Sequence, residues 1–206
     1  MKRRRNNIFV LGIVEITLVL TSILIFSFIY NGDVEQSIYF KEAKLSEQEE
    51  NMVALVADQS FLAIYDFNVE HNVPSAQMEL KVNVYSLDSD NWEHLSTVSR
   101  VLDSISGRVM FEFDGNCIYS SIQSDGLVSR SAFSLDDYVV DDGIVITNFF
   151  EGSYDMEMGE EVAVALQVIS VDEYSTGSSV DSFYEPDAFS EFEYAYAITV
   201  QFDKSN

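Results

Sequence analysis

The chain contains one cysteine and two prolines among its 206 residues, and both shortages limit the fold. With Cys117 alone, no disulfide can form within the chain, so the hydrophobic core must stabilise the fold. Pro74 and Pro186 both fall between the predicted strands, as strand pairing requires. The sequence also lacks repeats of about 20–50 residues, which excludes solenoids and propellers.

Basic residues are scarce as well, because the chain has 11 Lys and Arg against 35 Asp and Glu. This balance excludes nucleic acid as a partner, since phosphate binding requires a basic surface. Close contact with anionic lipid headgroups is disfavoured for the same reason. Metal ions, basic peptides and basic protein surfaces are the partners that such an acidic chain can attract.

One long apolar run, Ile8–Tyr30, follows directly after the sequence MKRRRNN. At about 1.5 Å per residue, a helix over this run reaches across a hydrocarbon core of about 30 Å. The run is longer than the apolar part of a signal peptide, and no typical cleavage site follows it, so we expect an uncleaved membrane anchor. The basic residues before it predict a cytoplasmic N-terminus and an extracytoplasmic remainder.

The part of the chain beyond this run carries seven basic and 34 acidic residues. Four of the 11 basic residues precede the run and one of the 35 acids, Glu15, lies inside it, so the formal charge of the remainder is −27. The chain is nevertheless 47% hydrophobic, with 15 Phe and 11 Tyr, which is typical of a folded domain and not of a disordered acidic tail. The absence of Asn-x-Ser/Thr sequons and the scarcity of cysteine favour a bacterial cell surface.

We divide the chain into four parts. Residues 1–7 form a basic cytoplasmic N-terminus, and residues 8–30 form a transmembrane signal anchor. Residues 31–58 form a polar exit linker and one short helix, and residues 59–206 form an acidic extracytoplasmic domain. Within that domain a long mobile loop is expected near residues 170–191, where serines and acids separate two strands.

The short helix is predicted over residues 47–57, after a polar segment at residues 31–44. Ser46 and Glu49 have the spacing of a capping box, in which the serine accepts from the backbone N–H of the glutamate and the glutamate side chain reaches back. Apolar residues then follow at helical spacing. We expect this helix to dock on the domain that follows.

Beyond this helix the hydrophobic pattern changes to a period of two, which is typical of strands with one buried face. The predicted strands cover residues 61–69, 77–87, 108–113, 117–123, 144–150, 162–169 and 193–203. Asp114-Gly115-Asn116 supplies a turn, so the third and fourth of these strands form a hairpin. About six to eight strands with almost no helical periodicity predict an all-β fold, a β-sandwich, with a closed barrel as the alternative.

Aromatic residues within and near the predicted loop could serve a partner or the core. Tyr174, Phe183, Tyr184 and Phe189 give residues 170–191 more anchors than a plain linker needs, although a loop of this length is either functional or disordered. Trp92 could stack on a sugar or anchor a partner, but a lone aromatic residue in a β protein more often packs.

Motifs for catalysis are absent. His71 and His94 belong to no His-x-x-x-His pattern, and no Cys-x-x-Cys occurs, so a zinc site of common type is not expected. Neither Cys117 nor Ser131 has a local partner that would activate it as a nucleophile. The nucleophile-elbow, phosphate-loop and dinucleotide-binding motifs are missing too. We therefore predict that the chain is not an enzyme, and we assign no catalytic, cofactor-binding or metal-binding residue.

Paired carboxylates are the one polar pattern that recurs. They occur at Asp88 and Asp90, Asp136 and Asp137, Asp141 and Asp142, and Glu160 and Glu161. Two carboxylates can hydrolyse a glycoside, and Asp88-Ser89-Asp90-Asn91 begins like a calcium loop. The glycine and the distal glutamate of the full calcium loop are missing, however, since Ser99 stands in the last position. Solvated surface turns that keep the protein soluble are the favoured interpretation of such acids.

Three functions are compatible with these observations. The first is a non-catalytic binding module of the cell envelope, with a basic protein partner and with calcium as a further candidate ligand. The second is an accessory subunit of a membrane complex, in which Glu15 pairs with another membrane helix. The third is a cell-envelope hydrolase that uses paired carboxylates. The absence of a catalytic motif favours the first.

Overall fold

The computed structural model describes residues 37–56, 58, 61–69, 78–88, 91–135, 143–170 and 179–205. The predicted cytoplasmic N-terminus and transmembrane anchor, residues 1–30, lie outside these described residues. Within the described ranges, no helix combines the length and the apolar character that crossing a membrane requires.

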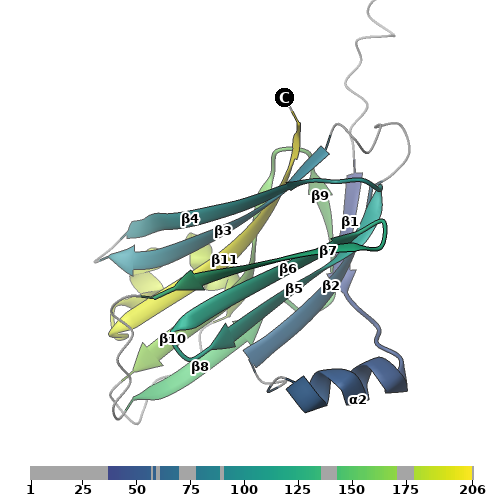
Figure 1. The fold of residues 1–206 in the computed structure, drawn as a ribbon. Helices are drawn as coiled ribbons and strands as arrows, with labels where there is room; N and C mark the ends of the chain where they lie inside the picture. The colour runs from purple at the N-terminus through teal and green to yellow at the C-terminus, as the bar shows by residue number, and fades with distance from the viewer. Residues whose placement is uncertain are drawn as a thin grey trace, which may run out of the picture. The chain divides into compact units, whose positions relative to one another are not determined.

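The described residues form two antiparallel sheets in a sandwich-like arrangement (Figure 1). Sheet A has the strand order β7-β6-β5-β2-β1-β9, and sheet B has the order β4-β3-β11-β10-β8. The strands of sheet A are β1 (Ser37–Glu42), β2 (Leu62–Val69), β5 (Ser106–Asp114), β6 (Cys117–Ser124), β7 (Leu127–Ser134) and β9 (Ser153–Glu157). Those of sheet B are β3 (Met78–Asp88), β4 (Asn91–Val101), β8 (Ile144–Phe149), β10 (Glu161–Ser170) and β11 (Tyr194–Lys204). Two separate sheets confirm the predicted sandwich over the closed barrel.

The main hydrophobic core lies between the two sheets. On β5, Val109, Phe111 and Phe113 are buried in it while the residues between them are only partly covered, as the period of two predicts. Aromatic rings connect the layers, since the ring of Phe67 in sheet A lies 5.3 Å from that of Phe202 in sheet B in an edge-to-face contact.

Close backbone packing beside Phe67 explains Gly107 on the neighbouring strand. A Cβ atom at this position would lie 2.2 Å from the carbonyl oxygen of Gln123 and 2.5 Å from Cζ of Phe67. Neither distance is physically allowed, so a larger residue would displace β6 or the phenylalanine ring.

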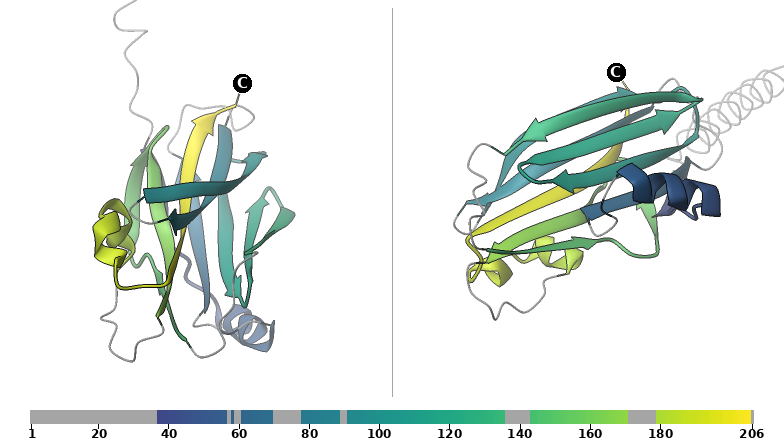
Figure 2. Two further views of the ribbon diagram at one scale, coloured as in Figure 1. Left: turned by 90° about the vertical axis from the view of Figure 1, so that its left-hand side faces the viewer. Right: turned by 60° about the horizontal axis from the view of Figure 1, so that its bottom comes forward.

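Sheet B is also partly covered on its outer face, the face that points away from the main core. Two 3-10 helices, η3 (Val180–Tyr184) and η4 (Pro186–Phe189), bury Val180 and Phe189 in a second hydrophobic cluster with β10 and β11. Figure 2 shows these helices against sheet B, whereas the α-helix lies at one end of sheet A. The predicted long loop at residues 170–191 is therefore wrong for residues 179–191, because their apolar side chains pack on the sheet; residues 171–178 lie outside the described residues.

The α-helix α2 (Glu47–Val56) confirms the predicted short helix. Its capping box is formed: the backbone N–H of Glu49 donates to Ser46 Oγ at 3.3 Å, and the backbone N–H of Ser46 donates to Glu49 Oε2 at 2.8 Å. Both partners lie within four residues of each other, which is why the sequence predicts this feature.

The expected number of strands, six to eight, is too low, because the described residues form eleven. The seven predicted strands are all present, and the predicted hairpin joins β5 to β6. The strands that the pattern did not predict are β1, β4, β7 and β9. The polar exit segment predicted at residues 31–44 is wrong for Ser37–Glu42. These residues form β1 between β2 and β9, and Ile38 and Phe40 are buried in the main core.

Candidate functional site

A groove of about 800 Å³ lies between α2 and the ends of β1, β2 and β8. Apolar and aromatic side chains contribute to its lining, together with three carboxylates and one lysine, and polar atoms form the larger part of its surface. The lining residues are Glu42, Ala43, Lys44, Leu45, Glu50, Val53, Leu62, Ala63, Ile64, Tyr65, Phe149, Phe150 and Glu151. A groove of this size can take a short peptide segment or an amphiphilic molecule.

The helix that borders the groove makes little contact with the rest of the domain. Among the side chains of α2 that the structure describes, Val53 alone is half-buried. Met52 is 59% and Leu55 is 81% exposed, although both are large and apolar. Since most helical stability in proteins comes from a packed apolar face, α2 is only weakly fixed by packing.

Arg108 of β5 links α2 to the sheet. Its Nη1 donates to Glu49 Oε1 of α2 at 2.9 Å, and its Nε donates to Asp66 Oδ1 of β2 at 2.8 Å. Hydrogen bonds from Ser46 and then from Arg108 lower the pKa of Glu49 from its ordinary value of 4.5 to about 2. The ion pair therefore connects α2 to sheet A.

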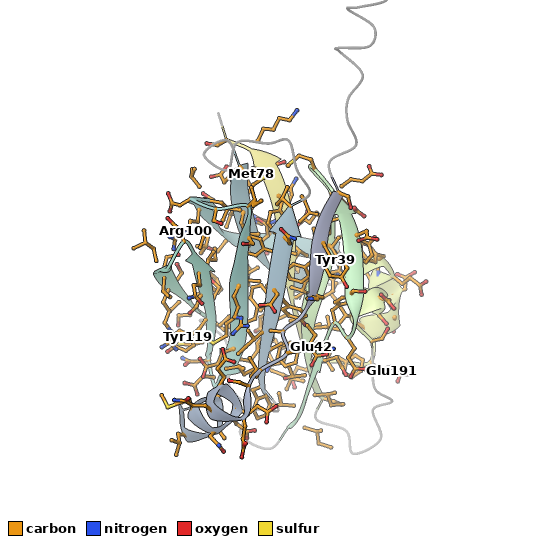
Figure 3. The ribbon with its side chains drawn as sticks, turned by 90° about the vertical axis from the view of Figure 1, so that its right-hand side faces the viewer. Tyr39, Glu42, Met78, Arg100, Tyr119 and Glu191 are labelled. Atoms are coloured by element: carbon orange, nitrogen blue, oxygen red, sulfur yellow. The ribbon has the colours of Figure 1, made fainter. Side chains whose placement is uncertain are left out.

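Negative charge surrounds the groove. The carboxylates come from Glu42 at the end of β1, Glu50 of α2 and Glu151 after β8, and Figure 3 shows Glu42 at the end of β1 nearest to α2. Two of these charges act on Tyr65, which lies in the floor of the groove. Burial raises the pKa of the Tyr65 hydroxyl, and the charges of Glu42 and Glu151 raise it further. Lys44 is the one basic residue among the lining residues.

Tyr65 closes the floor of the groove without being available to a ligand. Its hydroxyl donates to the carbonyl oxygens of Phe150 at 2.9 Å and Val164 at 3.2 Å. Its ring stacks on Phe40 with centroids 4.8 Å apart. The groove thus combines a rigid apolar floor with an acidic rim, which suits a ligand that is apolar on one side and positively charged on the other.

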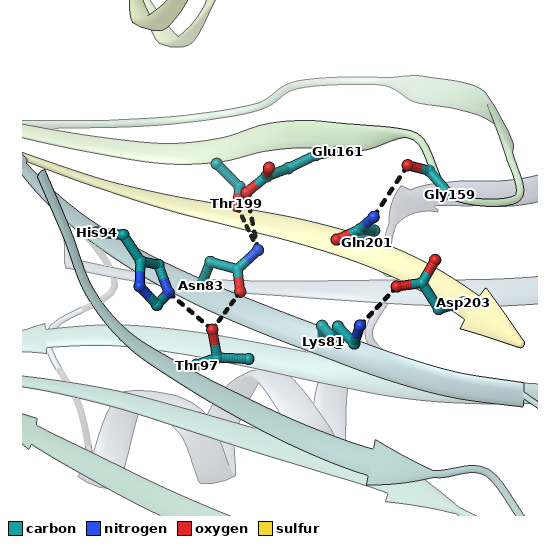
Figure 4. Close-up of polar contacts among 9 residues, drawn as sticks. All are labelled: Lys81, Asn83, His94, Thr97, Gly159, Glu161, Thr199, Gln201 and Asp203. Carbon is teal, nitrogen blue, oxygen red and sulfur yellow. Dashed lines mark hydrogen bonds and ion pairs between the residues drawn. The ribbon is translucent and has the colours of Figure 1, made fainter. Parts of the chain in front are cut away.

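A second polar feature lies on the outer face of sheet B, where the cover of η3 and η4 ends (Figure 4). Glu161 of β10 accepts at Oε1 from Asn83 Nδ2 at 2.8 Å, from the Tyr85 hydroxyl at 2.7 Å, and from Thr199 Oγ1. Burial, and then the carboxylate of Glu161, raise the pKa of Tyr85 to about 12. These contacts connect three neighbouring strands through one carboxylate.

The network continues to His94 of β4 through Thr97. Thr97 Oγ1 donates to Asn83 Oδ1 at 2.7 Å, so its only proton is used, and His94 Nε2 at 2.7 Å must be the donor to Thr97. The hydroxyl of Thr199 likewise donates within the network. The hydroxyl of Thr199 therefore faces the Glu161 carboxylate, and that of Thr97 faces the ring of His94. Together these contacts connect four strands of sheet B.

Most of the residues that the sequence singled out are dispersed. Trp92 packs on Phe183 and Phe189 under the 3-10 helices, with ring centroids 5.1 and 5.5 Å apart. Cys117 is half-buried at the β5–β6 turn, and Ser131 is half-buried on β7. His71, Asp90, Tyr174, Glu15 and the pairs at Asp136, Asp137, Asp141 and Asp142 lie outside the described residues.

The carboxylates of the adjacent acids Glu160 and Glu161 do not converge, because each binds different partners. Glu160 accepts from the Tyr154 hydroxyl at 2.9 Å and from the backbone N–H of Glu157 at 2.8 Å, whereas Glu161 joins the network on sheet B. In the described ranges, no three His, Cys, Asp or Glu side chains gather into a group that could hold a metal ion.

The residues of the groove were not predicted. Glu42, Glu50 and Glu151 belong to three different elements, and no spacing in the sequence relates them.

No protein-family model, curated protein or solved structure matches the chain.

Proposed function

We propose that this protein is a membrane-anchored, extracytoplasmic interaction module without catalytic activity, and that it binds a basic, partly apolar segment of a protein partner in the groove beside α2. The apolar run Ile8–Tyr30 and the basic residues before it support the anchor and its orientation. The groove supports the binding role.

The observation that carries this proposal is the combination of floor and rim in the groove. Leu45, Leu62 and Phe149 offer apolar surface, and Glu42, Glu50 and Glu151 carry three negative charges around it. Burial of an apolar face contributes affinity, while the charges select a basic ligand and speed its encounter.

The charge of the whole domain favours the same class of partner. Four of the seven basic residues beyond the apolar run already form ion pairs with carboxylates of the chain: Lys81, Arg100, Arg108 and Arg130. The large excess of acids over basic residues creates a field that attracts cationic surfaces over about a Debye length, roughly 8 Å at physiological salt.

The test is an in-cell crosslink and pull-down with the full-length, detergent-extracted chain, followed by titration with a synthetic amphipathic peptide of Lys and Leu. The groove variant replaces Glu42, Glu50 and Glu151 by Gln. At roughly 0.5 kcal/mol for each exposed ion pair, it should weaken peptide binding by about tenfold. Added salt should weaken the wild-type complex in the same direction.

The matched control replaces three other exposed acids, Glu93, Glu185 and Glu191, by Gln, so that the net charge changes equally. It should bind like the wild type, because these residues lie away from the groove. Equal weakening by both variants would mean that net charge alone attracts the peptide, and unchanged binding by the groove variant would refute the site.

A further inference from the structure

The outer edge of β7 is an unprotected strand edge. β7 pairs with β6 on one side, and no strand among the described residues pairs with its other side. Leu127 is 60% and Val128 is 65% exposed at the start of the strand. Proteins usually protect such an edge with charges, proline or a bulge, because its free backbone groups can bind another strand.

The backbone groups that face outward can be assigned from the pairing with β6. The N–H of Leu135 donates to the carbonyl of Asn116 at 2.8 Å, and this pair continues the β6–β7 register. Hydrogen-bonded pairs alternate along an antiparallel ladder, so the odd-numbered residues of β7 bond to β6. Val128, Arg130, Ala132 and Ser134 therefore direct their N–H and C=O groups away from the sheet.

Charge distinguishes this edge from the others. Neither β6 nor β7 contains an acidic residue, although the chain beyond the apolar run has a formal charge of −27. Arg130, the one charged residue of these two strands, pairs with Glu112 at 3.1 Å and lies over the ring of Tyr119. The edge strands β4 and β9 both contain acids, and β8 is half-buried along nearly its whole length.

We propose that β7 pairs with β7 of a second copy of this chain in an antiparallel manner, which would extend sheet A across a two-fold axis. Two strongly acidic molecules can approach most closely where both lack acids, and this edge is such a place. A two-fold pairing also joins identical surfaces, so one strand edge serves both copies.

The outward backbone groups restrict the register of this pairing. Opposed residues must lie on the same face of the sheet, and the even-numbered residues must form the hydrogen-bonded pairs. Centring the axis on Ser131 meets both conditions, with Arg130 opposite Ala132 and Val128 opposite Ser134. Centring it on Arg130 would place two like charges directly opposite each other, which is destabilising.

The test is disulfide trapping of the full-length chain in membranes of cells that produce it, in a Cys117→Ser background. Ser131→Cys places the two thiols in a non-hydrogen-bonded pair with Cα atoms about 4.5 Å apart, within disulfide range. Val128→Cys is the matched control, because its thiols would lie about 20 Å apart along the paired strands. Mild oxidation should give a covalent dimer with the first variant and not with the second.

A second variant distinguishes specific pairing from collision. Adding Ala132→Pro to Ser131→Cys removes an outward N–H that β6 does not use, so the chain should stay folded, as the fluorescence of its one tryptophan, Trp92, will report. The covalent dimer should fall at least fivefold. Equal trapping by Ser131→Cys and Val128→Cys, an unchanged yield with the proline, absence of a dimer, or capture of a different protein by Ser131→Cys would each overturn the proposal.

Discussion

Glu49 serves both the local structure of α2 and its attachment to sheet A. Its Oε2 accepts from the backbone and the hydroxyl of Ser46, each at 2.8 Å, and its Oε1 accepts from Arg108. The same carboxylate therefore caps the helix and fixes the helix beside the groove. Loss of its charge would weaken both contacts at once.

We expect acid to release α2 before it unfolds the sheets. Because the pKa of Glu49 is lowered from 4.5 to about 2, its contribution to stability is present above about pH 4.5 and is lost as the pH falls toward 2. Amide hydrogen exchange of α2 should accelerate over this range, while exchange in β5 stays slow. Glu49→Gln should make that exchange fast already at neutral pH. Titration of the Glu49 carboxyl near pH 4.5 would contradict this assignment.

Residue-level features were predictable where the partners are close in sequence. The capping box of Ser46 and Glu49 spans three residues, so its spacing indicates the contact. Asn83 and Thr199 are 116 residues apart and meet only because β3 and β11 pair in a particular register. No sequence pattern contains that register, which is why the network around Glu161 and the groove carboxylates were not predicted.

At the scale of elements, the 3-10 helices η3 and η4 cover part of the outer face of sheet B. Trp92 Nε1 donates to the carbonyl of Phe183 at 2.8 Å, and Phe189 is fully buried below. On β11, Ala195 and Ala197 lie under this cover, while Thr199, Gln201 and Asp203 further along the same face are polar. The change from small to polar side chains along one face thus marks where the cover ends.

Phe189→Ala should destabilise the protein by about 3–5 kcal/mol, because it leaves a cavity in the cluster beneath η4. Phe189 is 1% exposed, whereas Tyr184 on the same segment is 59% exposed. Tyr184→Ala, the control, should therefore cost less than about 1 kcal/mol. Urea unfolding followed by Trp92 fluorescence measures both, and a loss below about 1 kcal/mol for Phe189→Ala would show that the buried ring of η4 does not contribute to stability.

The missed strands have identifiable physical causes. The register between β3 and β4 shifts at Leu95, and this bulge interrupts the period of two on which strand prediction depends. β9 and β7 are edge strands with exposed residues on both faces, so no apolar alternation appears. β1 is short, and the segment around its buried Ile38 and Phe40 is rich in polar residues. Inner strands such as β10 and β11 were predicted because burial imposes apolar residues on them.

For the whole molecule, self-repulsion is the dominant electrostatic term. Beyond the apolar run 34 acids face seven basic residues, and the four ion-paired basic residues are all at least partly exposed, so each pair contributes little. The overall sandwich was predictable from its many strands and turns, since these need only local patterns. The strand order was not, because it depends on which distant strands pair.

Moderate salt should therefore stabilise the protein. Raising NaCl from about 10 mM to about 150 mM shortens the Debye length from roughly 30 to 8 Å and screens the repulsion among the acids. A gain of about 1 kcal/mol would raise Tm by about 2–4 °C for a domain of this size. Calorimetry at both salt concentrations measures the shift, with equal osmolarity of sucrose as the control. A lower Tm in salt would mean that the ion pairs outweigh the repulsion.

The position of β1 has a mechanical consequence. β1 is an inner strand of sheet A, paired with β2 on one side and β9 on the other, and β11 lies in the middle of sheet B. A pull on Ser37 along the axis of β1 would load the ladders with β2 and β9 together, because β1 is paired on both sides. Tension on the C-terminal strand meets the same resistance. Both β1 and β11 are thus placed to resist tension along the chain.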